Sequence, residues 1–145
     1  MGLPEITQAL KRETEAWNAH DADRVAACYA DDAVLYDVGL PEPLRGRAAI
    51  RDSVAGYLAA FSDLHVSMDE PVVSGHRAAQ EWKVTGTNDG QLFGIPPTGK
   101  GATTYGCATS EFGEDGLIRR AGNYWNAAAL LQQLGVLPET AGAPA

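Results

Sequence analysis

The second half of the chain consists of strand-length segments separated by turn residues, and this pattern limits the possible folds more than any other feature. Leu64, Val66 and Met68 alternate with polar residues, which is typical of a strand with one buried face. Three longer strands are predicted after it, at residues 77–88, 102–112 and 117–126. The segments between them are rich in Gly, Pro and Asp, as hairpin turns are, so we predict a meandering, mostly antiparallel sheet.

The first half of the chain has helical periodicity instead. Ile6, Ala9 and Leu10 are spaced for one face of a helix over residues 3–18. Asp21 suits the N-cap of a second, short helix. This short helix is predicted to end at Asp31-Asp32. A strand at residues 33–38, a helix at 48–61 and a last short helix at 127–134 are also predicted.

One domain accounts for nearly the whole chain. A length of 145 residues, of which 45% are hydrophobic and 21% charged, fits a single globular unit. We assign residues 1–138 to this domain and expect residues 139–145 to form a flexible tail. Helices followed by a long antiparallel sheet are the order of an α+β fold, and a sheet this long is expected to curl around the helices.

The charge balance narrows the possible partners. The formal net charge is −8, and binding to phosphates needs cationic side chains, so no nucleic-acid partner is expected. An anionic membrane surface is disfavoured for the same reason. No apolar run approaches the roughly 20 residues of a membrane span, and no secretory signal is visible, so we expect a cytoplasmic protein.

Two parts of the sequence are similar to known families. Residues 29–51 read YADDAVLYDVGLPEPLRGRAAIR and resemble the ketosteroid isomerases, in which such a strand ends in the catalytic Asp. The second half resembles the SnoaL-like polyketide cyclases, in the stretches at residues 86–88, 94–100, 124–126 and 130–135. Both families belong to the nuclear transport factor two-like superfamily. The resemblance implies a cystatin-like α+β barrel, in which a curved, mostly antiparallel sheet wraps around N-terminal helices to form a cone-shaped pocket.

The sequence departs from both families at the catalytic positions. Asn88 stands where the SnoaL-like proteins have a His, and Asn126 stands where they have an acid/base Asp. Glu13 and Ala108 occupy the two positions that form the oxyanion hole of ketosteroid isomerases. Asp37 alone keeps its family role, since it falls on the position of the catalytic base.

Asp37, Asn88 and Asn126 are therefore the candidate catalytic residues. A carboxylate beside an apolar pocket loses hydration and becomes a usable base for a proton next to a carbonyl group. Amides do not titrate, but an Asn can donate a hydrogen bond to an enolate oxygen. The alternatives are a strand-end Asp that caps the following turn and two Asn residues that are plain polar strand ends.

Aromatic side chains are the candidates for a flat wall around a ligand. Trp82 has the strand parity of Asn88, and Tyr124 has that of Asn126. Trp17, Tyr36 and Tyr105 are further candidates, although each of these aromatic residues could equally belong to the core. Glu13 lies on an otherwise apolar helix stripe and could face the pocket as a second carboxyl group, but we favour its exposure to solvent.

No metal or cofactor is expected. The three histidines are not at metal-ligand spacing, and no Cys pair or His-x-Glu motif is present. No glycine-rich phosphate loop follows a predicted strand.

Three functions remain open, all with an apolar or aromatic small molecule as ligand. The first is a cofactor-independent enzyme that cyclises or isomerises a polyketide-like carbonyl compound through an enolate. The second, which the SnoaL-like resemblance also implies, is cofactor-free hydroxylation of an aromatic polyketide. The third is a non-catalytic ligand-binding or dimerisation module. In each case the open face of the sheet needs a cover, so we expect a homodimer.

Overall fold

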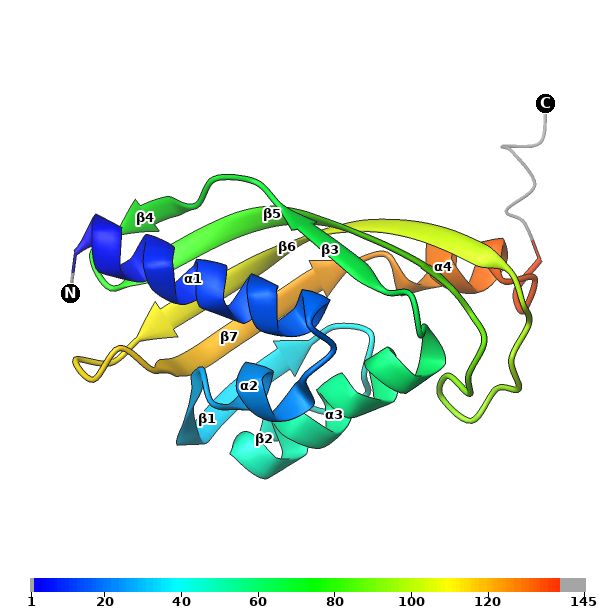
Figure 1. Cartoon of the computed structure of the whole chain (residues 1–145), viewed down its shortest axis with the longest axis horizontal. Coiled ribbons are helices and arrows are strands. Elements are labelled where there is room, and N and C mark those ends of the chain that lie inside the picture. The colour runs from blue at the N-terminus through cyan, green and yellow to red at the C-terminus, as the bar shows by residue number, and fades with distance from the viewer. Residues whose placement is uncertain (1, 139–145) are drawn as a thin grey trace.

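Seven strands form one curved sheet in the computed structural model, which describes residues 2–138 (Figure 1). The predicted tail at residues 139–145 lies outside the described residues. The strands follow the spatial order β2-β1-β7-β6-β5-β3, and β4 pairs with β5. In chain order they are β1 (Tyr29–Asp37), β2 (Leu44–Arg45), β3 (His65–Met68), β4 (Val72–Ser74), β5 (Arg77–Thr87), β6 (Gly101–Phe112) and β7 (Ile118–Trp125).

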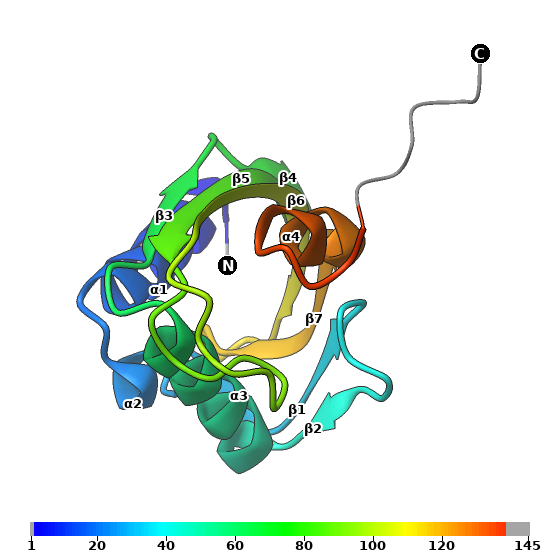
Figure 2. The same cartoon turned by 90° about the vertical axis from the view of Figure 1, so that its right-hand side faces the viewer.

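Four helices accompany the sheet, and three of them fill its open side. They are α1 (Leu3–Asn18), α2 (Ala22–Ala26), α3 (Arg47–Ala60) and α4 (Ala127–Gln133). Seen end-on, the sheet curves around from β3 to β2, and α1, α2 and α3 lie between these two edges (Figure 2). The architecture is the predicted α+β arrangement with a curved sheet that does not close on itself.

Apolar stripes on α1 and α3 attach these helices to the concave face of the sheet. Ile6 and Leu10 of α1 are buried, as the sequence spacing predicts, and so are Ile50 and Val54 of α3. Their burial on the inner face of the sheet fixes both helices along the cavity described below.

Several predicted elements match the structure closely. The helix expected at residues 3–18 is α1, and Asp21 caps α2 by accepting a hydrogen bond from the Arg24 amide. Asp31 and Asp32 are the clearest error, because they do not close a helix. They lie within β1, which already pairs with β7 at Tyr29.

The sheet also has a parallel pair that was not predicted. β1 and β7 run parallel, with Asp37 opposite Asn123, whereas the other paired strands are antiparallel. Parallel neighbours need a long connection and leave no turn signal in the sequence. The short strands β2 and β4 were not predicted either, since two or three residues carry too little alternation to be recognised.

Candidate active site

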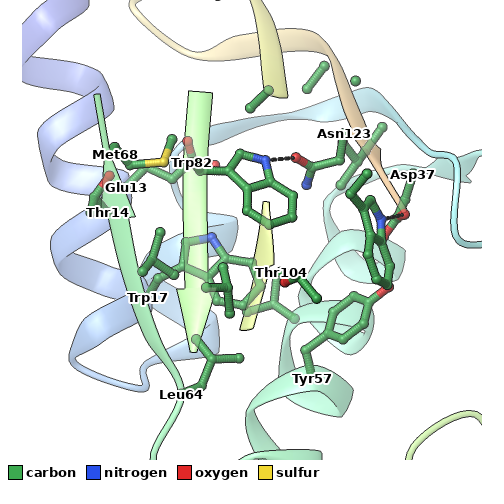
Figure 3. A pocket seen from close by; sticks show the side chains of 18 of the residues that line it. Glu13, Thr14, Trp17, Asp37, Tyr57, Leu64, Met68, Trp82, Thr104 and Asn123 are labelled. Atoms are coloured by element: carbon green, nitrogen blue, oxygen red, sulfur yellow. Dashed lines mark hydrogen bonds between the residues drawn. The ribbon is translucent and has the colours of Figure 1, made fainter. Parts of the chain in front are cut away.

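The curved sheet and the helices enclose one apolar cavity that is partly open to solvent (Figure 3). All three tryptophans of the chain, Trp17, Trp82 and Trp125, line it. Its volume is about 140 Å³, which by comparison with small engineered cavities holds about one aromatic ring. A larger ligand therefore extends towards the opening.

Asp37 lies at the end of β1 and is the buried carboxyl group of this cavity, with only 6% of its surface exposed. Its Oδ1 accepts hydrogen bonds from the Trp125 indole and the Gly39 amide, both at 2.8 Å. Its Oδ2 accepts one from the Tyr57 hydroxyl, also at 2.8 Å. Asp37 thus accepts three hydrogen bonds and donates none. This arrangement suits an ionised carboxylate, whose oxygens only accept hydrogen bonds.

Tyr57 is held in the neutral form beside Asp37. Burial raises the pKa of Tyr57, and the negative charge of Asp37 together with the hydrogen bond raises it further. Tyr57 therefore keeps its proton and donates a fixed hydrogen bond to Asp37; it does not act as a base. The ring of Phe93 packs edge-on against Tyr57, at 6.0 Å between centroids.

Trp82 and Asn123 form a second polar pair in the wall of the cavity. The Trp82 indole donates to Asn123 Oδ1 at 3.0 Å, so the amide oxygen is occupied. The amide nitrogen of Asn123 has no hydrogen-bond partner among residues 2–138, and Asn123 lines the cavity. This nitrogen is therefore a free donor for a ligand oxygen, held in orientation by Trp82.

Glu13 lines the cavity from α1, on the side opposite Asp37 (Figure 3). The exposure to solvent that we favoured is wrong. Glu13 Oε2 accepts a hydrogen bond of 2.6 Å from the Tyr29 hydroxyl. Burial raises the pKa of Glu13, and the hydrogen bond from Tyr29 opposes this effect without reversing it.

Asn88 and Asn126 are not brought to the cavity, which corrects their predicted catalytic role. Asn88 is buried, but its amide donates to Ala60 O and Gly90 O and accepts from both the amide and the hydroxyl of Thr98. It fixes the loop between β5 and β6. Asn126 is exposed and caps α4 through the Ala129 amide. Both positions lie just beyond a strand end, where strand parity no longer tells the direction of a side chain.

Replacement of Asn88 by Ala should therefore destabilise the fold. The change leaves buried backbone groups without partners, and we expect a loss of about 3 kcal/mol in the free energy of unfolding. Asn126→Ala removes only an exposed helix cap and should cost about 1 kcal/mol. Urea denaturation of both variants measures the difference, and an Asn88→Ala variant as stable as the parent chain would contradict the loop-fixing role.

Of the predicted aromatic wall, only Trp17 and Trp82 line the cavity. The placement of Tyr36, Tyr105 and Tyr124 corrects their assignment to the pocket, since none of them lines it. Tyr105 and Tyr124 are 66% and 51% exposed on the outer face of the sheet. Tyr36 faces the same side, where the Arg120 guanidinium lies 4.9 Å from its ring centre. The strand parity chosen for β7 was wrong by one residue.

Three site residues were not predicted, namely Tyr57, Asn123 and Trp125. Asn123 and Trp125 have the same parity along β7, and that parity also contains the buried Ala121. The available signal was Ala121, an apolar residue that directly follows two charged Arg residues and therefore indicates the buried parity of this strand. Tyr57 lies on α3, within the helix predicted at residues 48–61, and was not among the predicted site residues.

Among residues 2–138, no group of three or more His, Cys, Asp or Glu side chains could hold a metal ion. Within the same residues, no helix is long and apolar enough to cross a membrane.

The fold and the cavity define a class of protein, an α+β cone with a carboxylate in an apolar interior. Residues 10–121 match the family model of the SnoaL-like domain, and the chain belongs to this family, which confirms the resemblance found in the sequence.

Solved structures agree with this assignment at the level of the fold. AclR, a proposed hydroxylase from Streptomyces galilaeus, has a TM-score of 0.83 at 24% identity over 96% of this chain and 86% of its own. IdmH, a proposed polyketide cyclase from Streptomyces antibioticus, has a TM-score of 0.75 at 24% identity over 90% and 99%. A nuclear transport factor two-like protein of unknown function from Burkholderia pseudomallei has 0.76 at 17% over 92% and 98%. The predicted fold class is thus confirmed.

Proposed function

We propose that this chain is an enzyme of polyketide tailoring, which removes a proton next to a carbonyl group of an apolar small molecule. The enolate that forms then closes a ring or moves a double bond. The observation that supports this most directly is the buried Asp37 carboxylate, with its three donors, in the wall of an apolar cavity. The family and the likeness to IdmH favour a polyketide as substrate.

In this proposal Asp37 is the general base and Asn123 is the hydrogen-bond donor to the enolate oxygen. Asp37 Oδ2 accepts one hydrogen bond, from Tyr57, and has a second lone pair for the substrate proton. The amide nitrogen of Asn123 donates to the substrate oxygen on which the negative charge develops. Asp37 and Asn123 lie opposite each other on the parallel pair β1 and β7, so both can face one carbonyl group and its neighbouring carbon.

Hydrogen–deuterium exchange tests the proton transfer without knowledge of the natural substrate. We expect the protein to exchange the α-hydrogens of 2-tetralone, a bicyclic ketone, in D2O well above the protein-free rate. Binding of 2-tetralone without any catalysed exchange would favour the non-catalytic binding module instead. Because all three tryptophans line the cavity, their fluorescence reports this binding.

Asn123→Ala should slow this exchange about 100-fold, which is typical for the loss of one oxyanion donor. The variant also loses the partner of the Trp82 indole, so Asn123→Asp serves as a second variant that keeps an acceptor for Trp82 but has no amide donor. The exchange rate is followed by NMR. Equal rates in the parent chain and both variants would rule out the donor role.

The likeness to AclR favours one alternative, hydroxylation of an aromatic polyketide. In this hydroxylation too, the first step would be the removal of a proton by Asp37, from an electron-rich ring of the substrate. Oxygen uptake in the presence of a reduced, quinone-type substrate distinguishes the two reactions, because enolisation and ring closure consume no oxygen.

We further expect a homodimer that covers the outer face of the sheet. Tyr105 and Tyr124 lie there with most or half of their surface exposed, and exposed aromatic side chains on a sheet face are typical of an interface. Light scattering at micromolar concentration should give twice the mass of the chain, and Tyr105→Glu should shift it towards the monomer. A monomeric parent chain would contradict this prediction.

A further inference from the structure

We infer that Glu13 and Tyr29 form a second polar subsite of the cavity, which binds an acceptor oxygen of the ligand remote from the carbonyl group that faces Asp37. This inference rests on the proposed function for the position of the ligand. It defines the substrate class more narrowly, as an apolar molecule with two separated oxygen functions.

The geometry of Glu13 leaves one oxygen for a ligand. Oε2 accepts the hydrogen bond from the Tyr29 hydroxyl at 2.6 Å, and this uses the only proton of Tyr29. Oε1 has no hydrogen-bond partner among residues 2–138 and is not sealed from the cavity that Glu13 lines. This oxygen is therefore available to a ligand that enters the cavity.

The surroundings of Glu13 favour the neutral acid over the carboxylate. No Lys, Arg or His side chain in the described part of the chain forms an ion pair with Glu13. The titratable groups that interact with Glu13 are Tyr29 and Cys28, and burial raises the pKa of both, that of Cys28 to about 11. A carboxylate with no cation beside it is costly to bury, and burial raises the pKa of Glu13, so in this proposal Glu13 carries a proton that Oε1 can donate.

Asp37 and Glu13 thus differ in what they offer a ligand. Asp37 is surrounded by three donors and acts as an acceptor, whereas Glu13 has one donor partner and acts as a donor. Two carboxyl groups with different hydrogen-bonding surroundings are typical of sites in which one group accepts and the other donates. In the view of Figure 3, Glu13 and Asp37 lie on opposite sides of the cavity with the Trp82 indole between them, so we place a fused-ring ligand along the indole with one oxygen towards each carboxyl group.

Two bicyclic ketones of the same shape test the subsite. Decalin-2,6-dione has two acceptor oxygens and no donor, and 2-decalone lacks the second oxygen. We expect calorimetric titration of the full chain to show about tenfold tighter binding of the dione, the value of one well-placed hydrogen bond. Glu13→Leu should abolish this preference, and Glu13→Gln, whose amide nitrogen can still donate, should keep most of it.

Each outcome bears on the inference separately from the proposed function. Equal binding of the two ketones by the parent chain, or a preference that survives in Glu13→Leu, would overturn the subsite. A preference lost as completely in Glu13→Gln would show that a hydrogen bond donated from position 13 is not its cause, which also overturns the subsite. Infrared spectra should show a protonated carboxyl band at neutral pH that disappears in Glu13→Gln, and thermal unfolding checks that both variants fold. Exchange of 2-decalone α-hydrogens depends on Asp37, so its absence would defeat the proposed reaction and leave the subsite result standing.

Discussion

Asp37→Asn is expected to lower the rate of α-hydrogen exchange by about 10²- to 10⁴-fold, the usual contribution of a general base. The amide has the shape of the carboxylate, and its oxygen can still accept from Trp125 and Gly39 or from Tyr57. Its NH2 group cannot take a proton. The rate should therefore fall while 2-tetralone still binds in the cavity, which separates the loss of chemistry from the loss of the pocket.

Asp32→Asn is the matched control for this change. Asp32 lies on the same strand β1, but it is exposed and does not line the cavity, so its exchange rate should equal that of the parent chain. An Asp37→Asn variant with an unchanged rate would show that Asp37 only joins β1, β7 and α3 through its three hydrogen bonds. Loss of binding together with loss of the native circular dichroism would show the same structural role.

The fold could be predicted from the sequence wherever a local rule decides it. Helical spacing of Ile6, Ala9 and Leu10 gave α1, and the short polar side chain of Asp21 marked the start of α2. The pairing of β1 with β7 is decided by the packing of the whole sheet instead. No local residue pattern reports it, because the two strands are some 80 residues apart and run parallel.

The site residue whose position a family resemblance supplied was predicted. The site residues that depend on which face of the sheet a side chain points to were missed. Asp37 follows from the ketosteroid isomerase-like segment at residues 29–51. Asn126 and Asn123 are only three residues apart, but one caps α4 and the other lines the cavity. A shift of one residue in strand parity moves every side chain to the other face, which is how Tyr124 was chosen in place of Trp125.

Gly106→Ala is the second change with a large expected effect, a loss of about 3 kcal/mol in the free energy of unfolding. Gly106 lies opposite Trp82 on the neighbouring strand, and the indole rests on the space that a side chain would occupy. A Cβ at this position would lie 2.6 Å from Trp82 Cε2 and 2.7 Å from the main-chain oxygen of Tyr124. The main-chain oxygen is fixed by the pairing of β6 with β7, so the indole has to move.

Movement of the Trp82 indole has a consequence for the site as well. It breaks the hydrogen bond to Asn123 Oδ1, so the amide that we propose as donor to the enolate loses its fixed orientation. Gly106→Ala should thus change the tryptophan fluorescence and slow exchange, besides lowering the midpoint of urea denaturation. Gly101→Ala is the matched control on the same strand, where a Cβ would meet only the Gly86 oxygen at 3.9 Å, and its stability should stay within about 0.5 kcal/mol. If both variants unfold at the same urea concentration, the packing of Trp82 against Gly106 does not stabilise the fold, and the prediction is contradicted.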